Sequence, residues 1–323
     1  MIQKNSPDDK YLNKIKDTSF EPIFIVGQHR SGTSILYKIL DKTNQFNVVR
    51  LYHILEYEKL LYNHIKNLEK ETINRINNTI NKKNIDNRGS DHISISAESP
   101  VEYVFVYAEY VFPWYLNSDT LPYIETLCKK IKYISENEKP ILLKNPFDFS
   151  TFLFIKKMFP NSKFIFIHRN PIDVLNSLIR MLEKGFTEKN EYFGLMYKKY
   201  KLLFNNPISR YFLRLFFSTK IPIGLLELIR RSSKNVEYYL KNIDKIPEKD
   251  YVSIKYEDLC NKPNQTIGAI LDFLDLKTNF DASRFVEPRH TKTVKSVEIT
   301  EKLIYKTMKE YFENFGYTLK KQK

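Results

Sequence analysis

Short apolar runs alternate along the chain with longer segments whose apolar positions recur at helical spacing. The apolar runs predict four buried strands, at 22–27, 140–144, 163–168 and 251–255. Helical spacing predicts helices over 33–42, 149–159 and 265–274, helical segments around 53–80 and a loop over 81–91. Asn170, a preferred cap, and Pro171 predict that another helix begins directly after the third strand. Strands that alternate with helices indicate βαβ units, so we predict the α/β class with a mainly parallel sheet.

The stretch 186–235 interrupts this alternation, because it is basic and aromatic and contains two helix breakers, Pro207 and Pro222. We predict a helical insertion packed on the core. Two alternatives stay open, a lid over a bound molecule and a surface that contacts a membrane. Residues 284–318 are expected to form a basic loop and a final helix. The 323 residues show no internal repeat and are expected to form one domain, with its core at about 20–280.

Composition narrows the classes of protein to consider. The formal charge is +14, from 52 Lys and Arg against 38 Asp and Glu, which suits anionic partners such as nucleic acid, a membrane surface or a nucleotide. Cys128 and Cys260 lie far apart without a CxxC pair, so neither a zinc site nor a disulfide framework is indicated. Residues 1–21 are polar and no apolar run is long enough to span a membrane, so we expect a cytoplasmic protein.

A candidate anion site lies in the loop after the first strand. Gly27 and Gly32 have the spacing of the phosphate-binding sequence G-x-x-x-x-G-K-[ST], but Thr33 stands at the lysine position and the nearest cation is Arg30. The backbone N–H groups of such a turn, with the N-terminus of the next helix, bind an anion without the lysine. We therefore predict a P-loop-like, three-layer α/β/α fold that binds phosphate but is not an ordinary ATPase.

A second motif follows the third strand. Arg169 leaves the strand, and Ser177 lies about two turns along the next helix. Ligands of parallel α/β sheets bind outside the carboxyl ends of the strands, so Arg169 is expected at the same edge as the Gly27 loop. One molecule with phosphates at two positions would use both motifs.

Together these motifs resemble the sulfotransferases that use 3′-phosphoadenosine 5′-phosphosulfate (PAPS). Residues 24–34, FIVGQHRSGTS, look like the family's 5′-phosphosulfate loop, and residues 164–177, FIFIHRNPIDVLNS, look like its 3′-phosphate motif. Two further segments are similar to the family in the family's order, at 142–147 with 158–163 and at 255–259 with 270–276. Three positions depart from the usual pattern: His29 stands for proline, Ser34 for threonine and Asn170 for aspartate.

The resemblance implies an enzyme that moves a sulfuryl group from PAPS to a hydroxyl or amine by in-line transfer, without a metal. The residues implied to hold the donor are Gln28, His29, Arg30, Ser31, Gly32, Thr33, Ser34, Arg169, Ser177, Tyr256 and Arg289. Arg30 and Lys144 are assigned to the phosphosulfate and its bridging oxygen, where negative charge grows during transfer. Arg169 and Ser177 are assigned to the 3′-phosphate, which distinguishes PAPS from ATP.

The general base that takes the acceptor's proton stays open. The candidates are His53, Glu56, His92, Glu98 and Glu102. His29 is expected to face solvent from its loop. A solvent-exposed lysine at the end of a strand remains the alternative for Lys144.

Two other functions stay as alternatives. Another P-loop enzyme, a kinase or hydrolase, is disfavoured by the missing lysine. A basic nucleic-acid or membrane-surface binding protein is disfavoured by scattered lysines without a binding motif, and no nucleic-acid partner is expected. Peripheral membrane contact through 207–231 stays open, as do the oligomeric state and the acceptor, which could be a carbohydrate, lipid, phenol or peptide.

Overall fold

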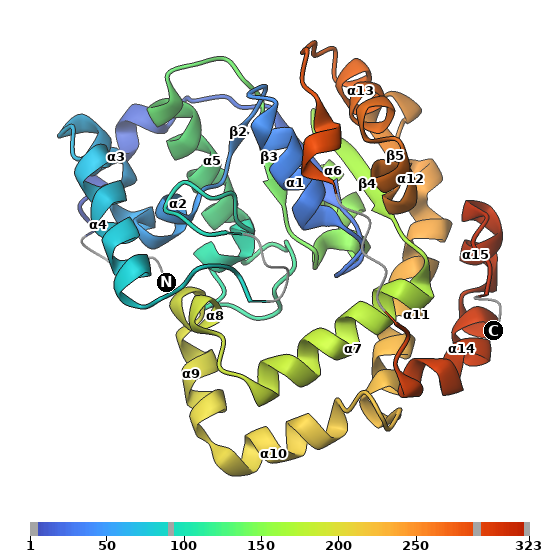
Figure 1. Cartoon of the computed structure of the whole chain (residues 1–323). Helices are drawn as coiled ribbons and strands as arrows, with labels where there is room; N and C mark the ends of the chain where they lie inside the picture. Colours follow the sequence, from blue (N-terminus) through green and yellow to red (C-terminus); the bar gives the residue numbers. More distant parts are fainter. Residues whose placement is uncertain (1–5, 90–93, 287–291, 320–323) are drawn as a thin grey trace.

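A five-stranded parallel sheet forms the centre of the computed structural model, which describes residues 6–89, 94–286 and 292–319 (Figure 1). The spatial order of the strands is β2-β3-β1-β4-β5. Their bounds are Pro22–Val26 (β1), Asn47–Val48 (β2), Ile141–Lys144 (β3), Lys163–His168 (β4) and Tyr251–Lys255 (β5). The predicted α/β class with a mainly parallel sheet is confirmed. The sequence does not predict β2, because two residues are too few to show an apolar pattern.

Helices surround the sheet. The first α-helices are α1 (Thr33–Lys42), α2 (Leu51–Leu55), α3 (Leu60–Ile65), α4 (Glu69–Lys82), α5 (Leu121–Ser135), α6 (Phe152–Met158) and α7 (Pro171–Thr187). The later ones are α8 (Glu191–Met196), α9 (Lys198–Asn205), α10 (Pro207–Phe216), α11 (Ile223–Asn242), α12 (Tyr256–Asn261), α13 (Pro263–Phe273), α14 (Lys295–Thr307) and α15 (Lys309–Phe315). Short 3₁₀ turns are η1 (Asp9–Ile15), η2 (Tyr57–Lys59), η3 (Tyr103–Val106), η4 (Asp148–Ser150), η5 (Ile243–Lys245), η6 (Glu248–Asp250) and η7 (Ala282–Phe285).

Alternate strand residues divide the buried side chains between the two faces of the sheet. Ile23 and Ile25 of β1 belong to a cluster that also contains side chains of α1, α12 and α13. Phe24 and Val26 belong to a second cluster, with side chains of α5, α6, α7 and α11. Helices therefore cover both faces, as the predicted three-layer arrangement requires.

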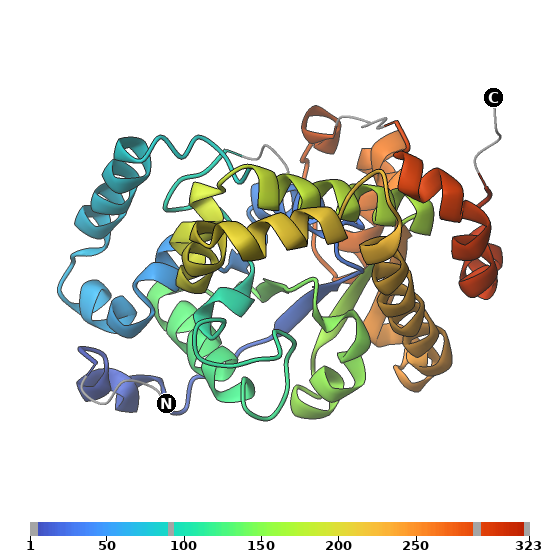
Figure 2. The same cartoon turned by 90° about the horizontal axis from the view of Figure 1, so that it is seen from below.

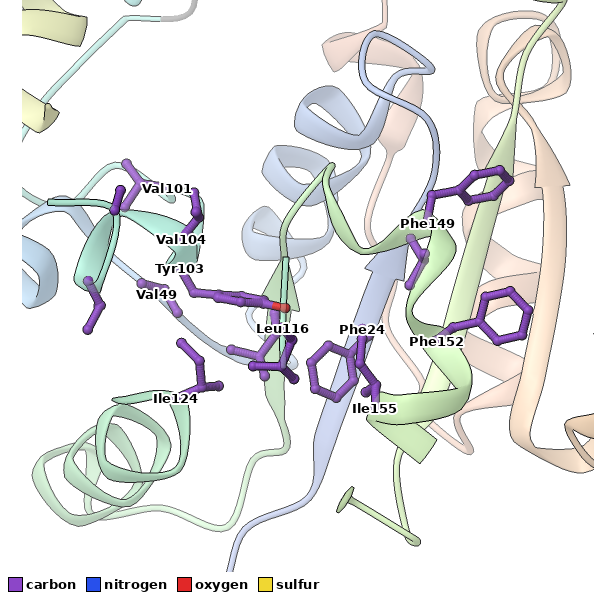
Figure 3. Close-up of a cluster of buried hydrophobic side chains, with 14 of the residues drawn as sticks. Phe24, Val49, Val101, Tyr103, Val104, Leu116, Ile124, Phe149, Phe152 and Ile155 are labelled. Atoms are coloured by element: carbon purple, nitrogen blue, oxygen red, sulfur yellow. The ribbon is translucent and has the colours of Figure 1, made fainter. Parts of the chain in front are cut away.

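The second cluster also fixes the segment that follows Glu102. Figure 3 shows the Tyr103 ring of η3 pointing toward Leu116 and Phe24, and Tyr103 and Val104 belong to the same buried cluster as Phe24. The Tyr103 hydroxyl donates to the buried carboxylate of Asp148, whose Oδ1 accepts from the backbone N–H of Leu116 at 2.7 Å. Because Asp148 lies just beyond β3, this contact holds the chain around Glu102 against the end of that strand.

The helical insertion differs from its predicted form. It is longer than 186–235, because α11 continues to Asn242. Helix α10 packs along α7; it lies at the lower edge of the molecule in Figure 1 and nearest the viewer in Figure 2. All of α10 lies in the described part of the chain and none of its residues is buried, so this helix packs on α7 without entering the core. The expected C-terminal helix is two helices, α14 and α15.

Candidate active site

The loop between β1 and α1 is shaped to approach an anion closely. Gly32 has a φ of 105°, and a Cβ at this position would lie 2.3 Å from Cδ2 of Tyr256, so only glycine fits. Arg30 also has a positive φ, of 75°. Gly32 caps α1, whose first N–H groups have no intrahelical partner and carry the positive end of the helix dipole. The predicted phosphate loop therefore has the backbone conformation of an anion-binding turn.

The two predicted phosphate motifs lie against each other. Nε of Arg30 donates to Oγ of Ser177 at 3.0 Å, and Nη1 of Arg169 donates to the carbonyl oxygen of Arg30 at 3.1 Å. The Arg169 guanidinium lies 4.3 Å from the centre of the Tyr256 ring, which also packs against Gly32. The predicted Asn170 cap of α7 is present, with its side chain accepting from the N–H of Ile172. The ends of β1 and β4 thus bring two arginines and a serine into one cluster.

A second cluster surrounds Lys144, which is 2% exposed. Its Nζ donates to Oγ of Ser34 at 3.0 Å and forms an ion pair with Oε1 of Glu102. The same carboxylate oxygen accepts from Nη2 of Arg88 at 2.5 Å. The interpretation of Lys144 as a solvent-exposed lysine is therefore wrong. Its contact with Ser34 connects this cluster to the first turn of α1.

Glu102 is held as a carboxylate by its neighbours. Burial raises its pKa, but the charges of Arg88 and Lys144 outweigh burial and hold the pKa below its ordinary range. Oε2 of Glu102 is buried and has no hydrogen-bond partner among the described residues. An ionised carboxylate with one unoccupied oxygen is able to accept a proton from a molecule bound beside it.

The other candidate bases have different surroundings. Nδ1 of His53 accepts from the backbone N–H of Arg50 at 3.0 Å, and burial lowers the pKa of His53 to about 3. Glu56 accepts from Nη2 of Arg75 at 2.7 Å, and Glu98 is exposed. His92 lies outside the described residues, as does the donor-site candidate Arg289. Glu102 is the candidate that the structure brings to Lys144 and Ser34.

His29 does not face solvent as expected. Its half-buried ring lies 5.9 Å from that of Phe147, which in turn contacts Trp114 at 5.4 Å between ring centres. Burial, followed by the charges of Arg30 and Lys144, lowers the pKa of His29 to about 3, so the ring is neutral at ordinary pH.

The remaining loop residues are buried with polar groups turned inward. Thr33 is buried, and Gln28 accepts a hydrogen bond from the Ser232 hydroxyl of α11. Among the described residues, Oγ of Ser31 and Nδ1 of His29 are buried without a hydrogen-bond partner. Buried polar atoms are usually satisfied, so these orphaned atoms fit a site that takes a polar ligand.

Sequence reasoning missed Arg88 and Ser232. Arg88 lies in the polar stretch 81–91, where it has the same local signal as any loop arginine, and Ser232 lies within a long helix. The backbone of Arg88 is fixed from the insertion, because Nδ2 of Asn190 donates to its carbonyl oxygen at 3.1 Å. Contacts between segments that are distant in the sequence bring these two residues to the site, so no local sequence pattern predicts their position.

A glycine loop at a helix N-terminus and a cationic cluster at the carboxyl edge of a parallel sheet are typical of proteins that bind phosphate-bearing ligands. A profile of the sulfotransferase family matches residues 22–204. This is more than half of the chain, so the chain belongs to the sulfotransferase family and is a sulfuryl-transferring enzyme. The alternatives of a kinase or a basic binding protein are thereby set aside.

Solved structures agree with this family in their fold. Sulfotransferase STF9 from Mycobacterium avium aligns with a TM-score of 0.64 at 14% identity, covering 97% of this chain and 81% of that chain. Sulfotransferase STF1 from Mycobacterium tuberculosis H37Rv aligns with a TM-score of 0.61 at 15% identity, covering 93% and 80%. No curated protein sequence matches the chain.

Proposed function

We propose that the sulfuryl donor is PAPS and that it binds along the carboxyl edge of the sheet without a metal. The observation that carries this proposal is the contact of Arg30 with both Ser177 and Arg169. A donor with phosphate at one end only would use the Gly27 loop alone. The cations and hydroxyl at the start of α7 suit a second phosphate, which in PAPS is the 3′-phosphate.

Each donor-site residue has a proposed task. Arg30, Thr33, Ser34 and Lys144 contact the phosphosulfate, while Arg169 and Ser177 contact the 3′-phosphate. The residues that shape the loop around the donor are Gln28, His29, Ser31, Gly32 and Tyr256, and Arg289 is proposed as a further contact.

We further propose Glu102 as the general base. In transfer, the acceptor oxygen forms a bond to sulfur, its proton passes to Oε2 of Glu102, and the bond from sulfur to the bridging oxygen breaks to leave 3′,5′-bisphosphoadenosine. Lys144 is placed to exchange its contact with Glu102 for one with the bridging oxygen as charge grows there. Losing that cation raises the proton affinity of Glu102 at the moment when the acceptor gives up its proton.

The acceptor and the cellular location belong to the same proposal. The acceptor presents a hydroxyl or amine, on a carbohydrate, lipid, phenol or peptide. Cys128 and Cys260 are free thiols, which suits an enzyme of the reducing cytoplasm.

Nucleotide selectivity tests the donor. We expect 3′,5′-bisphosphoadenosine to raise the melting temperature far more than AMP or ADP, with no metal added. Arg169→Gln should remove this preference, whereas the control Lys184→Gln, at an exposed position of α7, should keep it. Equal stabilisation by the three nucleotides would contradict the PAPS assignment.

A further inference from the structure

Helix α10 turns its apolar side outward. Ile208, Tyr211 and Phe212 are 68%, 66% and 63% exposed, and Leu215 and Phe216 are also exposed. Positions 208, 211, 212 and 215 share one side of a helix. A shallow groove lined by Phe212, Leu213, Leu215, Phe216 and Ile223 continues this side onto the start of α11. The α10 apolar surface is defined here as Ile208, Tyr211, Phe212, Leu215, Phe216 and Ile223.

The chain around this surface is cationic. Residues 192–226 contain no Asp or Glu, and their charged side chains are Lys198, Lys199, Lys201, Arg210, Arg214 and Lys220. Three carboxylates contact this stretch or follow it directly. Glu109 and Glu183 accept from the backbone N–H groups of Lys198 and Thr219, and Glu227 pairs with Arg230 and Arg231, so each of the three has a partner other than the side chains of the six cations. Apolar side chains flanked by cations are the combination that an anionic lipid surface attracts.

The shape and charge favour a bilayer over a second copy of the chain. Helix α10 is an outer ridge on one side of the molecule: it lies along the lower edge in Figure 1 and nearest the viewer in Figure 2, which is seen from below. A flat, deformable surface receives a ridge, whereas a protein partner needs a matching groove. A symmetric dimer through this ridge would bring the cations of both copies together, which is unfavourable.

The ridge also lies on the side of the sheet where the donor motifs meet. In Figure 1, α7 lies below the carboxyl ends of the strands, and α10 lies below α7 and packs along it. Half-buried Phe217 stacks on Phe186 of α7 at 5.9 Å between ring centres. The apolar side of α10, in contrast, is exposed. A lid would turn its apolar side chains toward the site, so this arrangement does not favour a lid.

We propose that the α10 apolar surface docks on an anionic lipid bilayer and presents the active-site edge to an acceptor at the membrane surface. The contact is peripheral, since no helix among the described residues is long and apolar enough to cross a membrane. The exposed apolar side chains and the surrounding cations support the docking independently of the enzyme's activity. Only the placement of the acceptor rests on the proposed function.

Vesicle co-sedimentation of the full chain tests the docking. Phosphatidylcholine vesicles with and without phosphatidylglycerol are compared, and we expect binding to the anionic vesicles that weakens as salt is added. Phe212→Ser with Leu215→Ser, and separately Arg214→Glu with Lys220→Glu, should each weaken binding roughly tenfold or more. The matched controls are Leu12→Ser in η1 and Lys249→Glu with Lys277→Glu, all at exposed positions far from α10 in sequence, and these should bind as the wild type does.

Melting curves with 3′,5′-bisphosphoadenosine separate this proposal from the donor site. The α10 variants should fold and bind the nucleotide as the wild type does, because their side chains are exposed. Absence of vesicle binding by a wild-type chain that binds the nucleotide would overturn the docking alone. The docking would also be overturned if the α10 variants bound vesicles as strongly as the wild type. It would likewise be overturned if sedimentation velocity showed a wild-type dimer that dissociated in the Phe212→Ser, Leu215→Ser variant. Loss of nucleotide binding by every chain would instead contradict the donor assignment.

Discussion

The donor edge of the sheet and the outer helices α8 to α10 are built on different principles. The donor edge is the carboxyl edge of the sheet, where β3 ends at Lys144 and β4 ends just before Arg169. The described cations Arg30, Lys144 and Arg169 each have a hydrogen-bond partner there. Around α10, apolar side chains face solvent and six cations lie in a segment without acidic residues. The first region suits the small donor proposed for it, whereas the second suits the proposed contact with a lipid surface. Aromatic composition alone does not separate them, because both contain phenylalanines.

The largest expected contrast is in stability. Phe152 is completely buried and packs on Phe166 and Tyr238, so Phe152→Ala should lower the free energy of unfolding by about 3–5 kcal/mol. Phe212→Ala removes a ring of similar size from α10, where it is mostly exposed, and should change that free energy by less than about 0.5 kcal/mol. Urea unfolding of both variants measures the difference. A strongly destabilised Phe212→Ala would mean that α10 packs against protein in solution.

The next contrast is between turnover and donor binding at the donor edge. Lys144→Ala should lower kcat by about 10²–10³-fold, because its proposed contact strengthens as charge develops on the bridging oxygen. Arg30→Ala should weaken both donor binding and turnover, since Arg30 also contacts Ser177. Steady-state kinetics separate the two effects. The control is Lys163→Ala, at the amino end of β4 and thus away from the carboxyl edge of the sheet, and it should keep the wild-type kcat. A Lys144→Ala enzyme with the wild-type kcat would contradict the role assigned to Lys144.

A pH profile sharpens the choice of general base. Arg88 lowers the pKa of Glu102 against the effect of burial, so Arg88→Met should raise that pKa and move the acid limb of kcat/KM to higher pH by about one unit. Arg75→Met is the matched control, because it removes the partner of Glu56 in the same way. A shift in the Arg75→Met enzyme, with none in Arg88→Met, would identify Glu56 in place of Glu102.

The sequence predicts which strands and loops form the carboxyl edge of the sheet. Each strand with its following loop is contiguous, so apolar runs locate β1, β3, β4 and β5, and the residues after β1 and β4 are the ones that meet. The pairing of Glu102 with Arg88 is formed by two irregular segments whose approach depends on Tyr103, Asp148 and Asn190, and no periodic pattern encodes it. For 186–235 the sequence predicts a helical insertion but leaves open whether its apolar side chains pack on the core, form a lid or contact a membrane. Amphipathic spacing fixes which residues share a face but not what covers that face.

The smallest expected effect concerns acid stability at His53. Burial lowers the folded-state pKa of His53 to about 3, below its ordinary value of 6.5, so the unfolded chain binds a proton that the folded chain excludes. Stability therefore falls as the pH falls below 6.5. His168, also lowered to about 3 by burial, acts in the same direction. Asp148 acts in the opposite direction, because burial raises its folded-state pKa to about 6 and the folded chain takes up the proton first. Between pH 7 and pH 6 each histidine should cost about 0.7 kcal/mol of unfolding free energy.

The substitution His53→Gln isolates the contribution of His53 to the loss of stability at lower pH. Glutamine at the third position of α2 keeps an acceptor for the backbone N–H of Arg50 but has no proton to gain in this range. Urea unfolding at the two pH values should therefore show a loss of stability that is smaller by about 0.7 kcal/mol than in the wild type. If the variant and the wild type lose the same unfolding free energy between pH 7 and pH 6, His53 takes up its proton in the folded protein as readily as in the unfolded chain. His53 would then again be a candidate for the general base.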